Sequence, residues 1–139
     1  MTDDLKAAVI STTSALRAQS TRLRIISENL ANAHSTSGSP GGDPYVRKTI
    51  SFSQELDRAT GASMVKVDAT GRDRSPFPTK IDPGNPSADA EGIVKLPNVN
   101  PLIEMSDMRE SHRSYEANLQ VVRQVREMVG DLLDLLRAK

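Results

Sequence analysis

The stretch MSDMRESHRSYEANLQVVRQVREMVGDLLDLL, residues 105–136, decides the fold of this 139-residue chain. One row of residues in it is spaced by alternating steps of three and four: Met105, Met108, His112, Tyr115, Leu119, Val122, Arg126, Val129, Leu133 and Leu136. A second, wholly apolar row lies beside it: Val121, Val125, Met128, Leu132 and Leu135. Steps of three and four keep residues on one face of an α-helix, so the stretch predicts one long helix. Two apolar rows need more cover than a single partner helix gives, so we expect further partners from other chains.

The N-terminal stretch, residues 3–33, has a similar but weaker pattern. One row is spaced by seven throughout, and a companion row lies four residues earlier in each repeat. The two rows are Val9, Leu16, Leu23 and Leu30, and Leu5, Thr12, Gln19 and Ile26. This is the spacing by which helices pair in coiled coils, and it predicts a second long helix with a polar middle. The Ser-, Gly- and Pro-containing stretch 35–43 ends that helix.

Proline and glycine divide the chain into three regions. All eight Pro and seven of the eight Gly lie between Gly38 and Pro101. Because Pro removes a backbone donor and clashes with the preceding turn, long helices are confined to the two ends. Residues 45–52, 64–67 and 93–96 are short strand candidates, and residues 82–86 predict a turn.

We therefore expect a mainly α fold. Paired long N- and C-terminal helices form a coiled-coil-like hairpin, and a small irregular β-containing segment lies between them in the sequence. The expected regions are residues 1–35, 36–101 and 102–139.

The composition excludes several classes of function. The 18 basic and 18 acidic side chains balance, which removes the main argument for a nucleic-acid binder. The absence of cysteine excludes disulfides, thiolate catalysis and cysteine-ligated zinc. A hydrophobic share of 37% with only 3% aromatic residues predicts that the chain's own core is thin. The acidic start and the lack of long apolar runs argue against a cleaved secretory signal and a membrane span.

No motif points to an active site, a metal or a cofactor. The two histidines, His34 and His112, have no second ligand at helical spacing. Asp89 and Glu91 share a loop, but the loop lacks the ligand spacing of an EF-hand. We therefore expect no catalytic residues, no cofactor and no small-molecule substrate. The alternative, a small enzyme that uses the Asp89–Glu91 loop, requires metal-dependent turnover.

Asn29 and Asn32 flank Leu30 and Ala31 near the end of the first predicted helix. Asn tolerates the left-handed conformation that ends many helices, so both residues fit a C-terminal cap. Buried amides also hydrogen-bond across helix interfaces and fix their register. The spacing leaves these two readings open.

The same stretch resembles a known signature. Residues 26–32, ISENLAN, resemble the Asn-Leu-Ala-Asn signature of bacterial flagellar rod, hook and other axial proteins. Residues 82–86 (DPGNP), 89–92 (DAEG) and 97–100 (PNVN) resemble the segment typical of the flagellar basal-body rod protein C family, whose members are proximal rod subunits. Glu104-Met105, Asp107-Met108 and residues 113–118 (RSYEAN) continue the match into the last helix. The Ser/Gly-rich stretch 33–43 is longer than in many axial proteins, which agrees with this subfamily.

The resemblance implies a structural protein of the flagellar motor. Its subunits stack helically into the rod, the drive shaft that crosses the periplasm, with paired terminal helices inside and the middle segment outside. The implied partners are copies of itself, other proximal rod subunits, the base of the rod at the membrane ring, and the flagellar type III export apparatus. Export through that apparatus needs no cleaved signal peptide.

The subunit interface expected from the apolar rows and from the resemblance contains these residues: Val9, Leu16, Leu23, Ile26, Asn29, Leu30, Asn32, Tyr115, Asn118, Leu119, Val121, Val122, Val125, Met128, Val129, Leu132, Leu133, Leu135 and Leu136. Because these helices lack their partners before assembly, we expect them to be largely disordered in the free subunit. A cytoplasmic two-helix adaptor or export chaperone is the alternative that the apolar rows alone would also fit.

Overall fold

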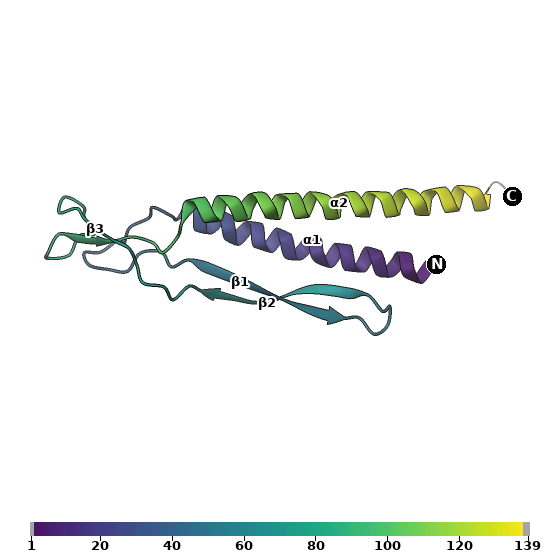
Figure 1. The fold of residues 1–139 in the computed structure, drawn as a ribbon, viewed down its shortest axis with the longest axis horizontal. Helices are drawn as coiled ribbons and strands as arrows, with labels where there is room; N and C mark the ends of the chain where they lie inside the picture. The colour runs from purple at the N-terminus through teal and green to yellow at the C-terminus, as the bar shows by residue number, and fades with distance from the viewer. Residues whose placement is uncertain (1, 138–139) are drawn as a thin grey trace. The chain divides into compact units, whose positions relative to one another are not determined.

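The computed structural model describes residues 2–137 of the chain. Two helices frame the sequence, α1 (Thr2–Ala31) and α2 (Pro101–Arg137), and four strands lie between them in the order β1 (Lys48–Leu56), β2 (Ser63–Arg72), β3 (Thr79–Ile81) and β4 (Ile93–Lys95) (Figure 1). The expected mainly α fold with a small β-containing middle agrees with this order. The coiled-coil-like pairing of the helices is not confirmed. Residues 1, 138 and 139 of the expected terminal regions lie outside the described residues.

The helix boundaries follow from local chemistry. At the start of α2, the Asn100 side-chain oxygen accepts a hydrogen bond from the Leu102 N–H at 3.0 Å, which is an N-cap. Pro101 follows it as the first helical residue, where its missing N–H costs nothing. At the end of α1, the Asn32 N–H donates to the carbonyl oxygens of Glu28 and Asn29 at 3.2 Å each, which closes the last turn.

The strand predictions agree with the structure in part. The candidate at residues 45–52 overlaps β1, which starts later and runs on to Leu56. The candidates at 64–67 and 93–96 fall within β2 and at β4. Strand β3, with the sequence TKI, has no alternating pattern and was not predicted. It forms by pairing antiparallel with β4, with Thr79 opposite Lys95 and Ile81 opposite Ile93.

The chain divides into two compact units that do not follow the order of the sequence. We call residues 2–22, 51–68 and 110–137 the hairpin unit, and residues 23–50 and 69–109 the junction unit. Each long helix, and each strand of the β1–β2 sheet, contributes residues to both units.

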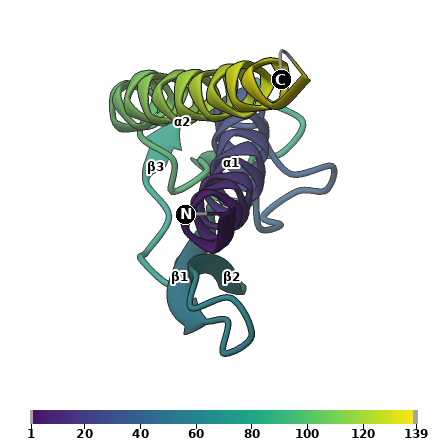
Figure 2. The same ribbon diagram turned by 90° about the vertical axis from the view of Figure 1, so that its right-hand side faces the viewer.

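In the hairpin unit, α1 lies between α2 on one side and the β1–β2 hairpin on the other (Figures 1 and 2). This position explains why most of the α1 residues in this unit are partly buried, whereas most of the α2 residues are exposed. The tip of the hairpin is closed by the Asp57 N–H, which donates to the Ala62 carbonyl oxygen at 2.8 Å. The hairpin is joined to α1 by the Val65 N–H, which donates to the Ser14 hydroxyl oxygen at 3.0 Å.

In the junction unit, two loops interlock beside the β3–β4 sheet. The Gly41 N–H donates to the Ser87 carbonyl oxygen, and the Ser87 hydroxyl donates to the Ser37 carbonyl oxygen. Asp89 organises its own loop, because its Oδ1 accepts hydrogen bonds from the Glu91 N–H at 3.1 Å and the Ile93 N–H at 2.8 Å. The residues of the DPGNP and DAEG segments therefore build a folded loop, and the Asp89 carboxylate is engaged by backbone donors.

Gly92 is required in that loop for two reasons. Its φ of +78° lies in the left-handed region, and an added Cβ would lie 2.9 Å from the Cγ of Pro83. We predict that Gly92→Ala destabilises the junction unit by about 2 kcal/mol or more, since the left-handed conformation alone costs an L-residue about 1–2 kcal/mol. Urea denaturation measures the effect. Gly84→Ala in the same loop is the control, because no atom lies within 4 Å of its added Cβ, and a loss there equal to that of Gly92→Ala would contradict the prediction.

The buried face of α2 coincides only in part with the row that passes through His112, Val122 and Arg126. His112 and Arg126 are exposed, whereas the residues buried on α2 are Glu104, Ser111, Val122 and Val125. These four combine one apolar member of each row, Val122 and Val125, with two polar residues that belong to neither row. A count of apolar residues cannot predict the burial of a carboxylate, because that burial depends on partners from elsewhere in the chain.

Candidate functional site

The residues expected at a subunit interface fall into three groups by burial. Four are buried within the chain: Ile26, Asn29, Val122 and Val125. Eight are partly buried: Val9, Leu16, Leu23, Leu30, Asn32, Tyr115, Asn118 and Leu119. Seven are exposed: Val121, Met128, Val129, Leu132, Leu133, Leu135 and Leu136. The exposed group belongs entirely to the last 17 described residues, 121–137, of α2.

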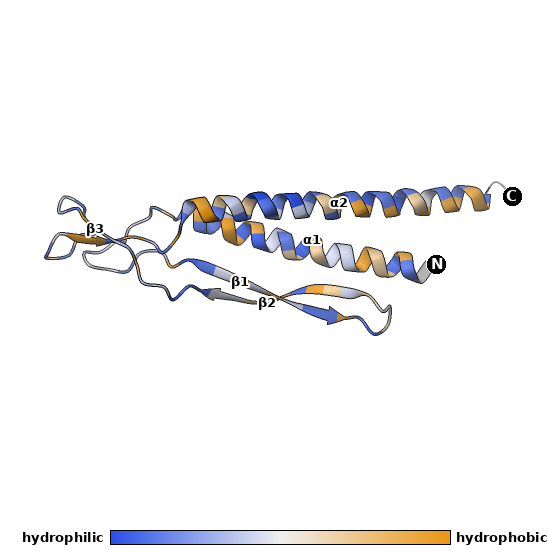
Figure 3. Cartoon of the chain, viewed as in Figure 1, coloured by the Kyte–Doolittle hydropathy of each residue, from blue (hydrophilic) through white to orange (hydrophobic). Residues whose placement is uncertain are grey.

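An apolar groove lies in the hairpin unit between the start of α1 and the end of α2. Its volume is about 910 Å³, and it is lined by Leu5, Lys6, Val9, Ile10, Val125, Val129, Leu132, Leu133, Leu135 and Leu136. Figure 3 shows apolar residues recurring along α2 toward its C-terminal end. Lys6 is the only lining residue with a charged side chain. We call this hollow the terminal groove.

Two side chains on α2 form a ridge beside the terminal groove. Leu132 and Leu135 line it and also line a second hollow of about 290 Å³ with Leu5, Met128 and Asp131. Leu132 is 40% exposed and Leu135 is 68% exposed. A ridge flanked by grooves is the surface that packs against the ridges and grooves of another helix. The geometry of this end of α2 thus favours a protein partner with a helical surface.

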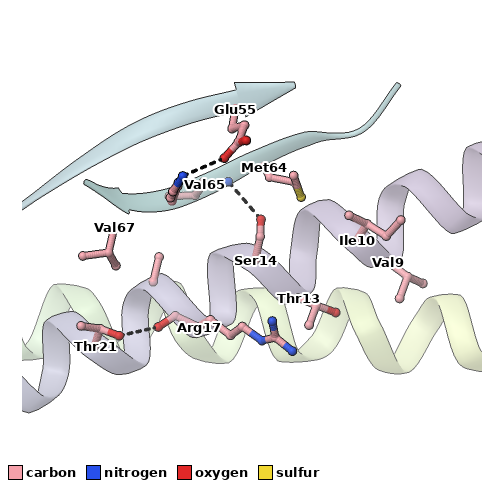
Figure 4. A pocket seen from close by; sticks show the side chains of 12 residues that line it. Val9, Ile10, Thr13, Ser14, Arg17, Thr21, Glu55, Met64, Val65 and Val67 are labelled. Atoms are coloured by element: carbon pink, nitrogen blue, oxygen red, sulfur yellow. Dashed lines mark hydrogen bonds and ion pairs between the residues drawn. The ribbon is translucent and has the colours of Figure 1, made fainter. Parts of the chain in front are cut away.

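A further hollow of about 500 Å³ lies between α1 and the hairpin (Figure 4). Val9 and Ile10 of α1 and Met64, Val65 and Val67 of β2 supply most of its apolar lining, and the Ser14–Val65 hydrogen bond crosses it. Glu55 and Lys66 form an ion pair at 3.4 Å on the hairpin side. The hairpin therefore contacts α1 over an incompletely filled surface.

Asn29 is the centre of a buried polar network in the junction unit. Its Nδ2 donates to the Lys48 carbonyl oxygen at 2.9 Å and to Oε2 of Glu104 at 3.2 Å. Its Oδ1 accepts hydrogen bonds from the Lys48 N–H at 2.8 Å and the Tyr45 hydroxyl at 2.9 Å. The amide has two donor hydrogens and two acceptor positions, so all of its hydrogen-bonding capacity is used within the chain. Burial raises the pKa of the Tyr45 hydroxyl.

Glu104 and Arg47 extend the network from α2 to the segment before β1. The Glu104 side chain is 1% exposed, and its Oε1 accepts a hydrogen bond from Nε of Arg47 at 2.6 Å. Arg47 also lies 3.6 Å from the carboxylate of Asp73, and its backbone N–H donates to the side-chain oxygen of Asn98 at 2.8 Å. A buried carboxylate is tolerated because a guanidinium and an amide hydrogen-bond to it. We call Asn29, Tyr45, Arg47, Asn98 and Glu104 the polar junction.

Asn32, the second asparagine of the signature, has a different role. Its Nδ2 donates to the Glu28 carbonyl oxygen at 2.8 Å, one turn earlier in the same helix. Its side-chain oxygen, Oδ1, accepts a long contact of 3.5 Å from the Ser35 hydroxyl. The Asn32 side chain thus donates a hydrogen bond to a carbonyl oxygen in the last turn of α1, as a capping residue does.

Glu28 forms a surface cluster with two cations at the edge of the polar junction. Its carboxylate lies 2.6 Å from Nζ of Lys48 and 3.2 Å from Nη1 of Arg24. The hydrogen bond from Lys48, with support from both positive charges, lowers the pKa of Glu28, and partial desolvation opposes the shift. A carboxyl group whose pKa is lower in the folded state adds stability above its unfolded pKa, and this stability is lost as the pH falls through the folded value.

We predict that the Glu28→Gln variant shows this pH dependence. At neutral pH it unfolds at a lower urea concentration than the parent chain, because the pair with Lys48 is lost. The difference in urea midpoint between the two chains shrinks as the pH falls through the lowered pKa of Glu28. The parent carboxyl is then protonated and as uncharged as the Gln side chain. A difference in midpoint that stays constant across the acid range would contradict the assignment.

The described residues contain no cluster of three or more His, Asp or Glu side chains that could hold a metal ion. His34 and His112 are exposed. Within residues 2–137, neither helix has the length and apolarity needed to cross a membrane. The arrangement offers packing surfaces and a structural polar network.

Sequence reasoning missed Glu104, a charged residue that is fully buried. Glu104 is the only acidic side chain in the first turn of α2, between the exposed residues Ile103 and Met105. An acid near a helix N-terminus is an ordinary surface feature, so its type gave no signal of burial. Arg47 and Tyr45 were placed in a strand candidate and assigned no role. The quoted motifs do contain Asn29, Asn98 and Glu104, and their presence in one set of motifs is the signal that could have pointed to this network.

Comparison with known proteins gives consistent matches at both ends of the chain. Residues 11–38 match the family model described as "Flagella basal body rod protein", and residues 90–135 match "Flagellar basal body rod FlgEFG protein C-terminal". The chain is 58% identical over 136 residues to the flagellar basal-body rod protein FlgC of Agrobacterium fabrum, with 98% of both chains covered. It is 43% identical over 124 residues to that of Salmonella typhimurium, covering 88% of this chain and 90% of the relative. It is 38% identical over 140 residues to that of Borreliella burgdorferi, covering 88% of this chain and 91% of the relative.

Proposed function

Because the chain belongs to the family of flagellar basal-body rod protein FlgC, it is a structural rod subunit rather than an enzyme, and we propose that it polymerises through its terminal helices. The observation that carries this proposal is the apolar surface at the end of α2. Leu132, Leu133, Leu135 and Leu136 are all exposed around the terminal groove. Monomeric proteins rarely expose so continuous an apolar surface without a partner for it.

The proposed mechanical task is the transmission of torque. A shaft without covalent cross-links holds through many distributed contacts, and this chain contains no cysteine to form disulfides. Full burial of one Leu or Val side chain contributes about 1.5–3 kcal/mol. The exposed residues of α2 therefore supply several kcal/mol to each contact with a neighbour, before the cost of ordering is subtracted. In this proposal, residues 1–35 and 102–139 form the core of the shaft, and residues 36–101 lie outside it.

The partners follow from the family. The chain associates with other components of the rod and basal body, and its location is the flagellar basal body. We propose that the immediate neighbours are copies of itself, other proximal rod subunits and the base of the rod at the membrane ring. We also propose that the subunit reaches the periplasm through the flagellar type III export apparatus without a cleaved signal peptide. Membership in the flagellar rod protein family supports this route.

Fractionation tests the proposal. A tagged copy that restores swimming to a strain lacking the gene should copurify with detergent-extracted basal bodies and be depleted from the cytoplasm. An export chaperone or cytoplasmic adaptor would instead stay in the cytoplasmic fraction and be absent from purified basal bodies. That result would overturn the proposal.

A further inference from the structure

The two units of the chain differ in how completely they are packed. The junction unit contains most of the buried residues: Ile25, Ile26, Asn29, Ala33, Ser87, Val94, Val99 and Glu104. The hairpin unit contains most of the large exposed apolar residues: Phe52, Leu56, Val65, Val121, Met128, Val129, Leu132, Leu133, Leu135 and Leu136. A segment with little buried apolar surface opens at a lower free energy than a well-packed one.

The two units also differ in whether their buried polar atoms have hydrogen-bond partners. In the junction unit, Asn29 uses all four hydrogen-bonding positions, and Glu104 is paired at both oxygens. Among the described residues, the buried side-chain polar atoms without a hydrogen-bond partner are Oε1 of Gln19 and Oγ of Ser111, both in the hairpin unit. A buried polar atom without a partner loses its hydrogen bond to water and gains none in the protein, which lowers stability. These atoms weaken the hairpin unit.

The polar junction also connects segments that are far apart in the sequence. It joins the end of α1 to the start of α2 through the Asn29–Glu104 hydrogen bond. It joins residues 73–75 to Arg47 through Asn98. The Asn98 Nδ2 donates to the Asp73 and Ser75 carbonyl oxygens at 3.2 Å each, and its Oδ1 accepts from the Arg47 N–H. The Asp73 N–H donates to the Arg47 carbonyl oxygen at 2.8 Å. All of these hydrogen bonds join residues of the junction unit to one another.

We propose that the polar junction keeps residues 23–50 and 69–109 folded in the unassembled subunit, while residues 2–22, 51–68 and 110–137 acquire stable structure only on assembly. The boundary of order then falls inside both long helices, near residues 22 and 109, and inside the β1–β2 sheet. The sequence predicts that both terminal helices are disordered along their whole length in the free subunit. The proposal limits that disorder to residues 2–22 of α1 and 110–137 of α2. Leu23–Ala31 and Pro101–Arg109 are already helical and are the points from which the rest of each helix grows. The inference rests on the proposed function only for the existence of an unassembled state.

Hydrogen exchange on the purified, full-length, monomeric chain tests this inference, with each peptide read by mass spectrometry. We expect peptides from residues 23–31, 45–50 and 87–99 to be protected, and peptides from residues 5–20 and 112–135 to exchange at least about tenfold faster. The test needs no basal bodies, so its failure is distinct from a failure of the fractionation experiment. Equal protection of the two units would overturn the inference.

The two asparagines of the signature provide a matched pair of variants. Asn29→Ala removes four hydrogen bonds, one buried and three partly buried, so we expect protection in the distant peptide 87–99 to fall by at least about tenfold. Asn32→Ala removes a bond within one helical turn, and its effect on peptide 87–99 should stay below about threefold. Equal effects of the two variants would contradict the role of the junction.

A milder variant covers the case in which Asn29→Ala does not fold at all. Glu104→Gln keeps the shape and the acceptor oxygen of the side chain and removes its charge toward Arg47. We expect its protection loss to be confined to residues 23–50 and 69–109 and to leave the exchange of residues 112–135 unchanged. A loss that spreads equally over both units would show that they order together and would overturn the inference.

Discussion

Leu132→Asp is expected to abolish incorporation of the subunit into the rod, and with it motility, while the protein is still made. Leu132 is 40% exposed in the single chain and lines two apolar hollows, so a carboxylate there remains hydrated before assembly. In the rod that carboxylate would be buried against an apolar neighbour without a partner, which costs several kcal/mol at each contact. Each 1.4 kcal/mol lowers the affinity about tenfold, and the loss repeats with every subunit.

Swimming in soft agar and the content of purified basal bodies measure this effect. Gln124→Asp is the control, since it adds the same charge to an exposed position of the same helix and should leave motility intact. The periodicity of the sequence treats Val125 and Leu132 alike as members of one row. The structure separates them, because Val125 is buried within the folded chain, so Val125→Asp also breaks packing inside the subunit in its folded form. Normal motility of the Leu132→Asp strain would contradict the proposed interface.

Arg47→Ala is expected to destabilise the junction unit by about 3–5 kcal/mol, the usual cost of breaking a buried ion pair from one side. The substitution leaves the buried carboxylate of Glu104 with the Asn29 amide as its remaining side-chain donor. Urea denaturation followed by the fluorescence of Tyr45, in a Tyr115→Phe background, reports on this unit because the chain has no Trp and only two Tyr.

Arg74→Ala is the matched control, because Arg74 belongs to the same unit and is exposed. Arg74→Ala should lower the free energy of unfolding by no more than about 0.5 kcal/mol, as most surface substitutions do. Replacing both partners of the pair, with Arg47→Met and Glu104→Leu together, should recover part of the stability, since no buried charge is then left without a partner. Equal effects of Arg47→Ala and Arg74→Ala would show that the buried pair contributes little.

The long helices could be predicted from the sequence because their signals are local. The spacing of apolar residues identifies α2 over its whole length, and the concentration of Pro and Gly between residues 38 and 101 confines helices to the ends. Pro is well suited to the first position of a helix, and α2 starts at Pro101. The turn at residues 82–86 was likewise predictable from its composition.

The buried face of α2 and the polar junction could not be predicted in this way. Glu104 and Ser111 are fully buried because of what the fold places beside them, and hydropathy counts both as surface residues. Strand β3 escaped prediction because three residues have no period, and its structure comes from pairing with β4. For Asn29 and Asn32 the sequence left capping and helix contacts open. The structure places Asn32 at the end of α1 and Asn29 in hydrogen bonds with Tyr45, Lys48 and Glu104 of its own chain.

The direct test of the account is a reconstruction of intact basal bodies by electron cryo-microscopy at side-chain resolution. We predict that Leu132 and Leu135, both exposed in the single chain, are buried there against helices of neighbouring rod subunits. We also predict that Asn29 still bonds to Lys48 and Glu104 of its own chain. A rod in which the end of α2 faces solvent, with contacts made instead by the middle segment, would contradict the account.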